Sequence, residues 1–345
     1  MSLDLPSTGS GAWTQAGAFE VAPGVHRVPL PLPDDGLRAV NVYVLTTPDG
    51  LVLIDAGWAI PEARALLDRA LAELDATAAD VARFLVTHVH RDHYTQAVTI
   101  RRELGTPIAL GRGEKPTMEA VQRPGVGILA PQIAALRRHG ALGVAAELAA
   151  HVGDRTVDPT DWELPDSWLS PGPIALGNRT LEAVETPGHT AGHLVFHDVA
   201  GALLFAGDHV LPTITPSIGF EQVAVADPLG AFLASLAVVR SRPDALLLPA
   251  HGPVAPSVHA RVDELLLHHE ERLARTAEAV EAGAHTPYAA AQRLGWTRRL
   301  RRFDELDPFN AMLATFETGA HLVLLTAQGH LRRSVVDGVD HYAPV

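Results

Sequence analysis

Four residues of the types that bind metal ions lie close together in segment 88–93, which reads His-Val-His-Arg-Asp-His. Imidazole and carboxylate groups together suit Zn²⁺ or another divalent ion of the first transition row. The apolar run 83–86 precedes this segment and predicts a strand that ends where the ligands begin. We therefore expect the four side chains to project from a loop at a strand end, as one half of a two-metal hydrolytic centre.

Three later segments share a pattern in which an apolar run is followed by a break at a small residue or proline, and then by His or Asp. They are 186–193 (Thr-Pro-Gly-His-Thr-Ala-Gly-His), 206–209 (Ala-Gly-Asp-His) and 249–252 (Pro-Ala-His-Gly). Glycine lets the backbone turn sharply and approach a metal closely, and a strand end holds a ligand on a rigid frame. These segments predict the other half of the centre.

The order His-x-His-x-Asp-His, Pro-Gly-His, Gly-Asp and Ala-His-Gly resembles the metallo-β-lactamase superfamily. Segment 52–57 (Val-Leu-Ile-Asp-Ala-Gly) also fits the first strand-helix-strand signature of that family. The resemblance extends from residue 20 to residue 280 or so. It implies an α/β fold, a four-layer αβ/βα sandwich with the metals at one edge between the two sheets.

The resemblance also implies a ligand set. The first metal would be held by His88, His90 and His189, the second by Asp92, His93 and His251, and Asp208 would bridge the two. Asp92 and Asp208 would also act in catalysis, because they compensate the charge of the metals.

Further residues would surround the ligands. Asp55 would orient a ligand histidine from outside, although it is also compatible with a plain turn in Asp-Ala-Gly, and His193 would be a structural neighbour. The loop after the bridging aspartate should border the substrate, which makes His209, Thr213 and Thr215 candidate pocket residues. An outward-facing His209 is an equal alternative.

Composition excludes several classes of function. The chain has no cysteine, which rules out disulfides, a thiolate nucleophile and a thiolate ligand. By family resemblance, antibiotic-hydrolysing relatives that use a cysteine ligand are therefore disfavoured, and Asp208 argues against those with an all-histidine site. The net charge of −13 disfavours a broad surface for nucleic acid.

No apolar run of membrane-spanning length occurs. Residues 1–20 lack a secretory leader, so the cytoplasm is the expected compartment.

Residues 20–283 are expected to form the catalytic domain, with an insertion at 113–168. Within the insertion we predict helices at 116–121, 131–138 and 142–151, and a loop follows at 152–173. The insertion would either cap the metal face or be an ordinary surface elaboration. As a cap it would supply apolar pocket walls such as Met118, Trp162 and Trp168. Outside it, helices are predicted at 61–74, 95–104, 229–240 and 258–282.

Residues 284–345 are expected to form a small winged-helix-like module. Helices at 286–294 and 308–319 would precede a hairpin of strands 321–326 and 331–336. The basic segment 298–302 would contact phosphate or, as the simpler interpretation, lie in solvent beside acidic neighbours. We favour a role in packing or dimerisation, which leaves a homodimer open.

Two divalent ions would share a hydroxide that attacks an acyl carbonyl. Zinc is favoured, and iron or manganese would suit the same ligands. The predicted function is hydrolysis of a small-molecule thioester or ester, as in the hydroxyacylglutathione hydrolase (glyoxalase II) branch of the family. The alternatives are a lactonase, an endoribonuclease that uses the C-terminal module, and a metal-binding regulator without catalysis. The last is disfavoured because every ligand position is filled.

Overall fold

Two β-sheets carry the aliphatic core of the chain, and the computed structural model describes residues 12–33, 35–297 and 300–345. The first sheet has the order β1-β2-β3-β4-β5-β6-β7. Its strands are Phe19–Ala22, Val25–Pro31, Ala39–Thr47, Gly50–Ile54, Val81–Val86, Ile108–Gly111 and Ser167–Leu169. Neighbours are antiparallel from β1 to β4 and parallel from β4 to β7.

The second sheet has the order β12-β11-β10-β9-β8. In chain order its strands are Gly172–Ala175 (β8), Thr180–Glu185, Leu194–Asp198, Leu203–Gly207 and Leu246–Pro249 (β12). Only the β11–β12 pair is parallel. Its inner face packs on the first sheet, where the rings of Tyr43 (β3) and Phe205 (β11) meet edge to face at 5.4 Å.

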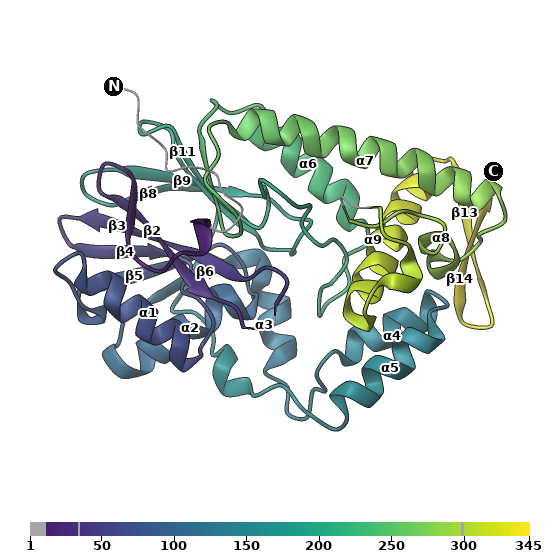
Figure 1. Cartoon of the computed structure of the whole chain (residues 1–345), viewed down its shortest axis with the longest axis horizontal. Helices are drawn as coiled ribbons and strands as arrows, with labels where there is room; N and C mark the ends of the chain where they lie inside the picture. The colour runs from purple at the N-terminus through teal and green to yellow at the C-terminus, as the bar shows by residue number, and fades with distance from the viewer. Residues whose placement is uncertain (1–11, 34, 298–299) are drawn as a thin grey trace.

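Helices cover the outer face of each sheet, which completes a mixed α/β sandwich of four layers (Figure 1). Helices α1 (Pro61–Ala72) and α2 (Arg91–Leu104) pack on the first sheet. Helices α6 (Pro228–Arg240) and α7 (Val258–Glu281) pack on the second. The helices predicted at 61–74, 229–240 and 258–282 are confirmed to within two residues at each end.

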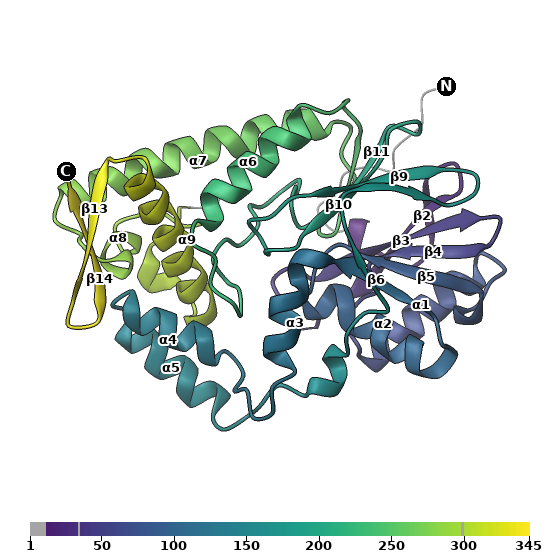
Figure 2. The ribbon, with the colours of Figure 1, turned by 180° about the vertical axis from the view of Figure 1, so that it is seen from behind.

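Helices α4 (Ala130–Arg138) and α5 (Leu142–Val152) of the insertion pack against the C-terminal segment on the side away from the sheets, whereas α3 (Lys115–Val121) lies beside the first sheet (Figures 1 and 2). These elements confirm the three helices predicted within the insertion. The C-terminal segment contains α8 (Pro287–Ala291) and α9 (Pro308–Ala327). One apolar cluster joins α4 and α5 to α8 and α9, with Leu136, Leu148, Met312 and Phe316 among its members.

The expected C-terminal hairpin was placed one strand too early. Residues 321–326 continue α9 instead of forming a strand, and the hairpin consists of β13 (Leu331–Val336) and β14 (Val339–Pro344). Because α9 is buried on most of its sides, its apolar residues recur without the one-sided helical pattern, and the run 321–326 resembles a buried strand. The order of helices followed by a hairpin is confirmed.

Two further expectations for the insertion were wrong. The stretch 152–173 is not only a loop, since it contains a 3-10 helix at Pro159–Trp162, strand β7 and the start of β8. Met118 does not form a pocket wall, because it is fully buried in the core beneath the first sheet. Trp162 and Trp168 are partly buried and pack against that core. Among the described residues, no helix combines the length and apolar character needed to cross a bilayer.

Truncating Met312 should test whether the insertion and the C-terminal segment fold together with the sandwich. Met312 is fully buried in their shared cluster, so Met312→Ala should lower the free energy of unfolding by about 2–5 kcal/mol. Denaturant unfolding followed by circular dichroism should show one transition. The control Leu142→Ala, at a side chain that is 62% exposed, should change stability by no more than about 0.5 kcal/mol. A separate early transition would show that the C-terminal module folds independently.

Candidate metal centre

The ends of four strands bring the predicted ligands to one edge of the sandwich. Strands β5, β9, β11 and β12 end at Val86, Glu185, Gly207 and Pro249, and a ligand segment follows each. One prediction was partly wrong, because α2 begins at Arg91 and the last two ligands of the first segment lie in its first turn instead of a loop. Asp92 there benefits from the positive end of the helix dipole.

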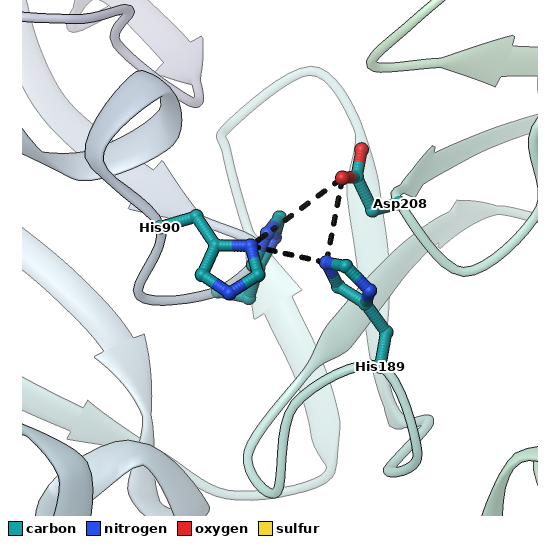
Figure 3. Close-up of side chains that lie close together, drawn as sticks. His90, His189 and Asp208 are labelled. Atoms are coloured by element: carbon teal, nitrogen blue, oxygen red, sulfur yellow. Dashed lines mark hydrogen bonds and ion pairs between the residues drawn. The ribbon is translucent and has the colours of Figure 1, made fainter. Parts of the chain in front are cut away.

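The first group of candidate ligands contains three histidines and one aspartate. His90 Nδ1 lies 3.0 Å from His88 Nε2 and 3.1 Å from His189 Nε2. His189 Nε2 lies 3.4 Å from Asp208 Oδ2 (Figure 3). Ligands about 2.0–2.1 Å from a zinc ion in tetrahedral geometry are separated by about 3.3 Å. The spacing of these four residues therefore fits one divalent ion.

The second group consists of Asp92, His93 and His251. Asp92 Oδ2 lies 3.3 Å from His251 Nε2 and 3.6 Å from His93 Nε2. All three residues are almost completely buried, with at most 9% of their surface exposed. The group therefore has the ligand types and spacing for a second divalent ion, while the donor set leaves the identity of the metal open.

Asp208 lies between the two groups, with one carboxylate oxygen facing each. Its Oδ2 faces His189 of the first group at 3.4 Å, and its Oδ1 faces His251 at 3.3 Å and His93 at 3.7 Å in the second. A carboxylate in this position can bridge two metal ions. The seven residues that the family pattern nominates are thus brought together, divided into the two groups that the pattern implies.

Unpaired polar atoms provide a direct test of whether metals fit. Within the described part of the chain, His93 Nε2, His251 Nε2 and Asp208 Oδ1 are buried without a hydrogen-bond partner. Buried polar atoms are nearly always paired, so three orphans that face one another need an explanation. A divalent cation would satisfy all three at once, and the residues therefore fit such an ion.

Asp55 supports the first ligand segment from behind. Its Oδ2 accepts a hydrogen bond from His93 Nδ1 at 2.9 Å, and its Oδ1 accepts one from the backbone N–H of Thr87 at 2.8 Å. The Thr87 hydroxyl also donates to Asp55, which leaves its oxygen free to accept from His88 Nδ1 at 3.0 Å. This network assigns the proton to Nδ1 of both rings and leaves Nε2 free for a metal. Asp55 adopts a left-handed conformation (φ 62°), which is uncommon outside glycine.

Two more candidate ligands, His189 and His251, direct Nε2 toward the centre, and backbone carbonyls orient their rings. His189 Nδ1 donates to the carbonyl of Ser217 at 2.8 Å, and His251 Nδ1 donates to the carbonyl of Ala39 at 2.7 Å. Both hydrogen bonds fix the ring with Nε2 toward the centre.

His193 belongs to neither ligand group. Its Nε2 accepts a hydrogen bond from the backbone N–H of Asp208 at 3.1 Å, so the proton is on Nδ1, which donates to the Thr186 hydroxyl at 2.8 Å. His193 therefore holds the backbone of the bridging aspartate, in agreement with the structural role that was expected.

Buried charge makes the centre attractive to cations. Burial tends to raise the pKa of Asp92, but His93 and His251 beside it hold that pKa well below its usual range. Burial tends to lower the pKa of His93, yet Asp55, Asp92 and Asp208 together raise it to about 10. Without metal, a proton on His93 thus partly compensates three carboxylates, the charge that a divalent ion would neutralise.

The candidate pocket residues are in different environments. His209 is completely buried, with its ring edge to face on Phe232 at 5.1 Å, so it neither faces outward nor contacts solvent at the centre. Burial also lowers its pKa to about 3, which keeps it neutral. Thr213 is exposed beside Gly252, the neighbour of His251, and Thr215 is half-buried. The two threonines remain candidates for the border of the site.

Phe220 ends the loop 212–220, which was expected to border the substrate, and its ring centroid lies 6.2 Å from that of His90. Two other residues near the ligands were missed by sequence reasoning. Glu114 accepts a hydrogen bond from Thr190, and Glu221 accepts one from the backbone N–H of Ala191, both beside His189. No local motif marks them. The only hint is the glycine pair that flanks Arg112 just before Glu114, because it indicates a close backbone approach.

Fold and site together define a class, in which a four-layer α/β sandwich carries two His/Asp groups that share one carboxylate. The family profile described as the Metallo-beta-lactamase superfamily matches residues 35–308. The chain therefore belongs to the metallo-β-lactamase superfamily, as the order of the sequence motifs predicted, and it carries a candidate site for divalent metal ions.

Known proteins agree with this assignment. The chain is 26% identical over 237 residues to the lactamase-like protein nscB of Aspergillus fumigatus, and the match spans 69% of this chain but only 55% of that protein. Two solved structures are similar along nearly the whole chain. A metallo-beta-lactamase family protein of Thermus thermophilus has a TM-score of 0.77 and 26% identity, with 94% of this chain and 100% of that one covered. A beta-lactamase domain protein of Burkholderia ambifaria has a TM-score of 0.78 and 27% identity, with 95% and 94% covered. Coverage above nine tenths means that most of the insertion and the C-terminal segment has counterparts there.

Replacing Asp55 should weaken metal binding without removing a ligand. In Asp55→Asn, one oxygen that orients His93 and Thr87 becomes an amide donor, so affinity for the metal held by His93 should fall about 10–100-fold. Metal titration of the metal-free protein measures this. The control Asp198→Asn removes a buried carboxylate that pairs with Arg179 in the second sheet, and should leave metal affinity unchanged. Wild-type affinity in Asp55→Asn would refute the orienting role.

Proposed function

We propose that the protein is a binuclear metal-dependent hydrolase that cleaves a thioester or an ester of a small-molecule acyl substrate, in the manner of a hydroxyacylglutathione hydrolase. The observation that carries the proposal is the position of Asp208, whose two oxygens face two separate ligand groups 3.3–3.4 Å away. Such an arrangement is suited to two metal ions acting on one substrate. When bound, the ions would supply a hydroxide near neutral pH and a Lewis acid for the carbonyl oxygen.

The residues of the chain would contribute charge and the orientation of the ligand rings. Asp92 and Asp208 stay ionised, because nearby histidines lower the pKa of each carboxyl against the effect of burial. Asp55, Ser217 and Ala39 hold the ligand rings in one tautomer. The absence of cysteine excludes a thiolate nucleophile in this chain. We assign Asp92 and Asp208 as catalytic and the seven residues of the two groups as metal ligands.

An aromatic wall next to the centre supports an acyl substrate with an apolar part. The wall consists of Phe220 and Phe309. The ring centroid of Phe220 lies 6.2 Å from that of His90 and 5.8 Å from that of Phe309. Phe309 belongs to the first turn of α9 and is 44% exposed, although it is a large apolar side chain. Gln132 of α4 donates to the backbone carbonyls of Phe220 and Glu221. The insertion and the C-terminal segment therefore both meet the metal centre at this loop.

The same wall would suit a lactone with an apolar chain, so lactonase activity is the second candidate function. The nuclease alternative has less support. Of its basic segment, Arg298 and Arg299 lie outside the described residues, and Arg302 pairs with Asp304. An ion-paired arginine has less capacity to bind phosphate.

Hydrolysis of an acylglutathione thioester by the metal-loaded protein tests the proposal. In Asp208→Asn, turnover should fall by about 100-fold or more, equivalent to about 2.7 kcal/mol, because the bridging charge is lost. A surface control, Asp263→Asn, removes a carboxylate that pairs with exposed Arg240 and should keep wild-type turnover. Turnover of lactones but not thioesters by wild-type protein would replace the thioesterase hypothesis with the lactonase. No turnover of either by fully metallated protein would refute both.

Phe309→Ala should change substrate preference more than catalytic rate. Loss of the ring removes apolar contact area at the wall, so KM for an ester with a long acyl chain should rise about tenfold, or about 1.4 kcal/mol. KM for the acetyl ester and both kcat values should change little. Steady-state kinetics on a series of chain lengths measures this. Leu267→Ala, at a side chain of α7 that is 57% exposed, is the matched apolar control. An equal effect on short and long chains would contradict an apolar subsite.

A further inference from the structure

The turn that carries His189 is held from several sides. His189 itself is anchored to the carbonyl of Ser217. The Thr190 hydroxyl donates to Oε1 of Glu114, and the backbone N–H of Ala191 donates to Oε2 of Glu221 at 2.9 Å. Two carboxyl groups from distant parts of the chain therefore accept hydrogen bonds from consecutive residues of one turn that carries a candidate ligand. Neither carboxyl belongs to a ligand group.

Glu114 joins this turn to the first ligand segment. It begins the insertion and is completely buried. Besides Thr190, the backbone N–H groups of Val89 and Gly192 face its carboxyl and lower its pKa, although burial dominates and raises that pKa to about 8. Val89 lies between the ligands His88 and His90. The Glu114 carboxyl is thus hydrogen-bonded to the 189–192 turn and lies near the first ligand segment, while its second oxygen, Oε2, is buried with no hydrogen-bond partner among the described residues.

Close backbone packing surrounds Glu114. A Cβ atom on Gly192 would lie 2.1 Å from the backbone nitrogen of Glu114, and one on Gly113 would lie 2.6 Å from the Cα of Gly192. Real side chains do not tolerate such distances, so glycine is required at these two positions. The base of the insertion is consequently pressed against the His189 turn, and the Glu114 carboxyl has little freedom to move.

Glu221 holds the same turn through its hydrogen bond from the backbone N–H of Ala191. It follows Phe220 in the loop beyond Asp208, and its second oxygen, Oε1, is buried with no hydrogen-bond partner among the described residues. Burial raises its pKa to about 7. Burying a carboxyl with one oxygen unsatisfied costs free energy, which is consistent with a positional role that outweighs local stability.

We propose that Glu114 and Glu221 are positioning residues, which hold the 189–192 turn between them and thereby set the affinity of the His88, His90 and His189 group for its metal. The proposal rests on the metal centre of the proposed function but not on thioester chemistry. It also links the aromatic wall to the centre, because Glu221 and Phe220 are adjacent and Gln132 of α4 binds the carbonyls of both. The insertion then acts on the metal as well as on the substrate.

The test uses Co²⁺ added to metal-free, full-length protein, with binding followed by visible absorption and by metal content after dialysis. Wild-type protein should bind two equivalents. Glu114→Ala and Glu221→Ala should each weaken one of the two sites about 10–100-fold and leave the other unchanged. Thr190→Val removes only the hydroxyl that donates to Glu114, and should weaken the same site. Combined with Glu114→Ala it should add little, since both changes break one hydrogen bond.

A control separates positioning from general stability. Asp340 is a buried carboxylate that pairs with Arg333 in the C-terminal hairpin, so Asp340→Ala should lower the thermal midpoint but keep both equivalents of Co²⁺. Wild-type affinities in both Glu221→Ala and Thr190→Val would overturn the proposal, even if Glu114→Ala does not fold. Equal weakening of both sites would also overturn it. Wild-type protein that binds fewer than two equivalents would instead refute the binuclear centre.

Discussion

The location of one carboxylate, that of Asp208, is the constraint on which the centre depends. It must reach two ligand groups at once, and its position is fixed through its backbone. The preceding Gly207 has a positive φ of 50°, and a Cβ there would lie 2.6 Å from His193 Nε2 and 2.8 Å from the Thr87 side chain. His193 in turn accepts a hydrogen bond from the Asp208 amide. A glycine, a neutral histidine and a strand end therefore place the aspartate before any metal is present, as a preorganised site requires.

The other candidate ligands are oriented around that carboxylate by residues outside the two ligand groups. Asp55 in a left-handed conformation supports His93 and Thr87, and through Thr87 it supports His88. The main-chain carbonyls of Ser217 and Ala39 support the rings from the other segments. Because these partners come from β3, from the end of β4 and from the loop after β11, the geometry of the centre depends on the packing of both sheets. A substitution deep in either sheet can therefore alter metal binding without changing a ligand.

Motifs that are local in sequence made much of this predictable. The ligand types, their order and the strand before each one were enough to predict a two-metal centre, and helix limits followed from Pro61 at the start of α1 and Gly105 at the end of α2. Interactions between distant segments were not predictable. Glu114 contacts a turn 76 positions away, and the α9 run at 321–326 becomes helical because other helices surround it. The first turn of α2 was missed because His and Asp ligands resemble loop residues when considered without the helix dipole that stabilises Asp92.

The candidate metal centre restricts the type of reaction more than it restricts the identity of the substrate. Two divalent ions held by the seven candidate ligands would supply chemistry that suits a thioester, an ester or a lactone alike, so these residues do not distinguish between the three bonds. Under the proposed function, discrimination would come from groups that meet the centre from outside, which here include Phe220, Phe309 of α9 and the α4 side chain of Gln132, which donates to the Phe220 carbonyl. Phe220 lies in the loop after β11 and packs against the apolar cluster that the insertion and the C-terminal segment share, and the other two groups belong to those two segments. In the proposed hydrolase, specificity would therefore depend on how those two segments pack together, which would make their common core part of the active-site architecture alongside the strands that carry the candidate ligands.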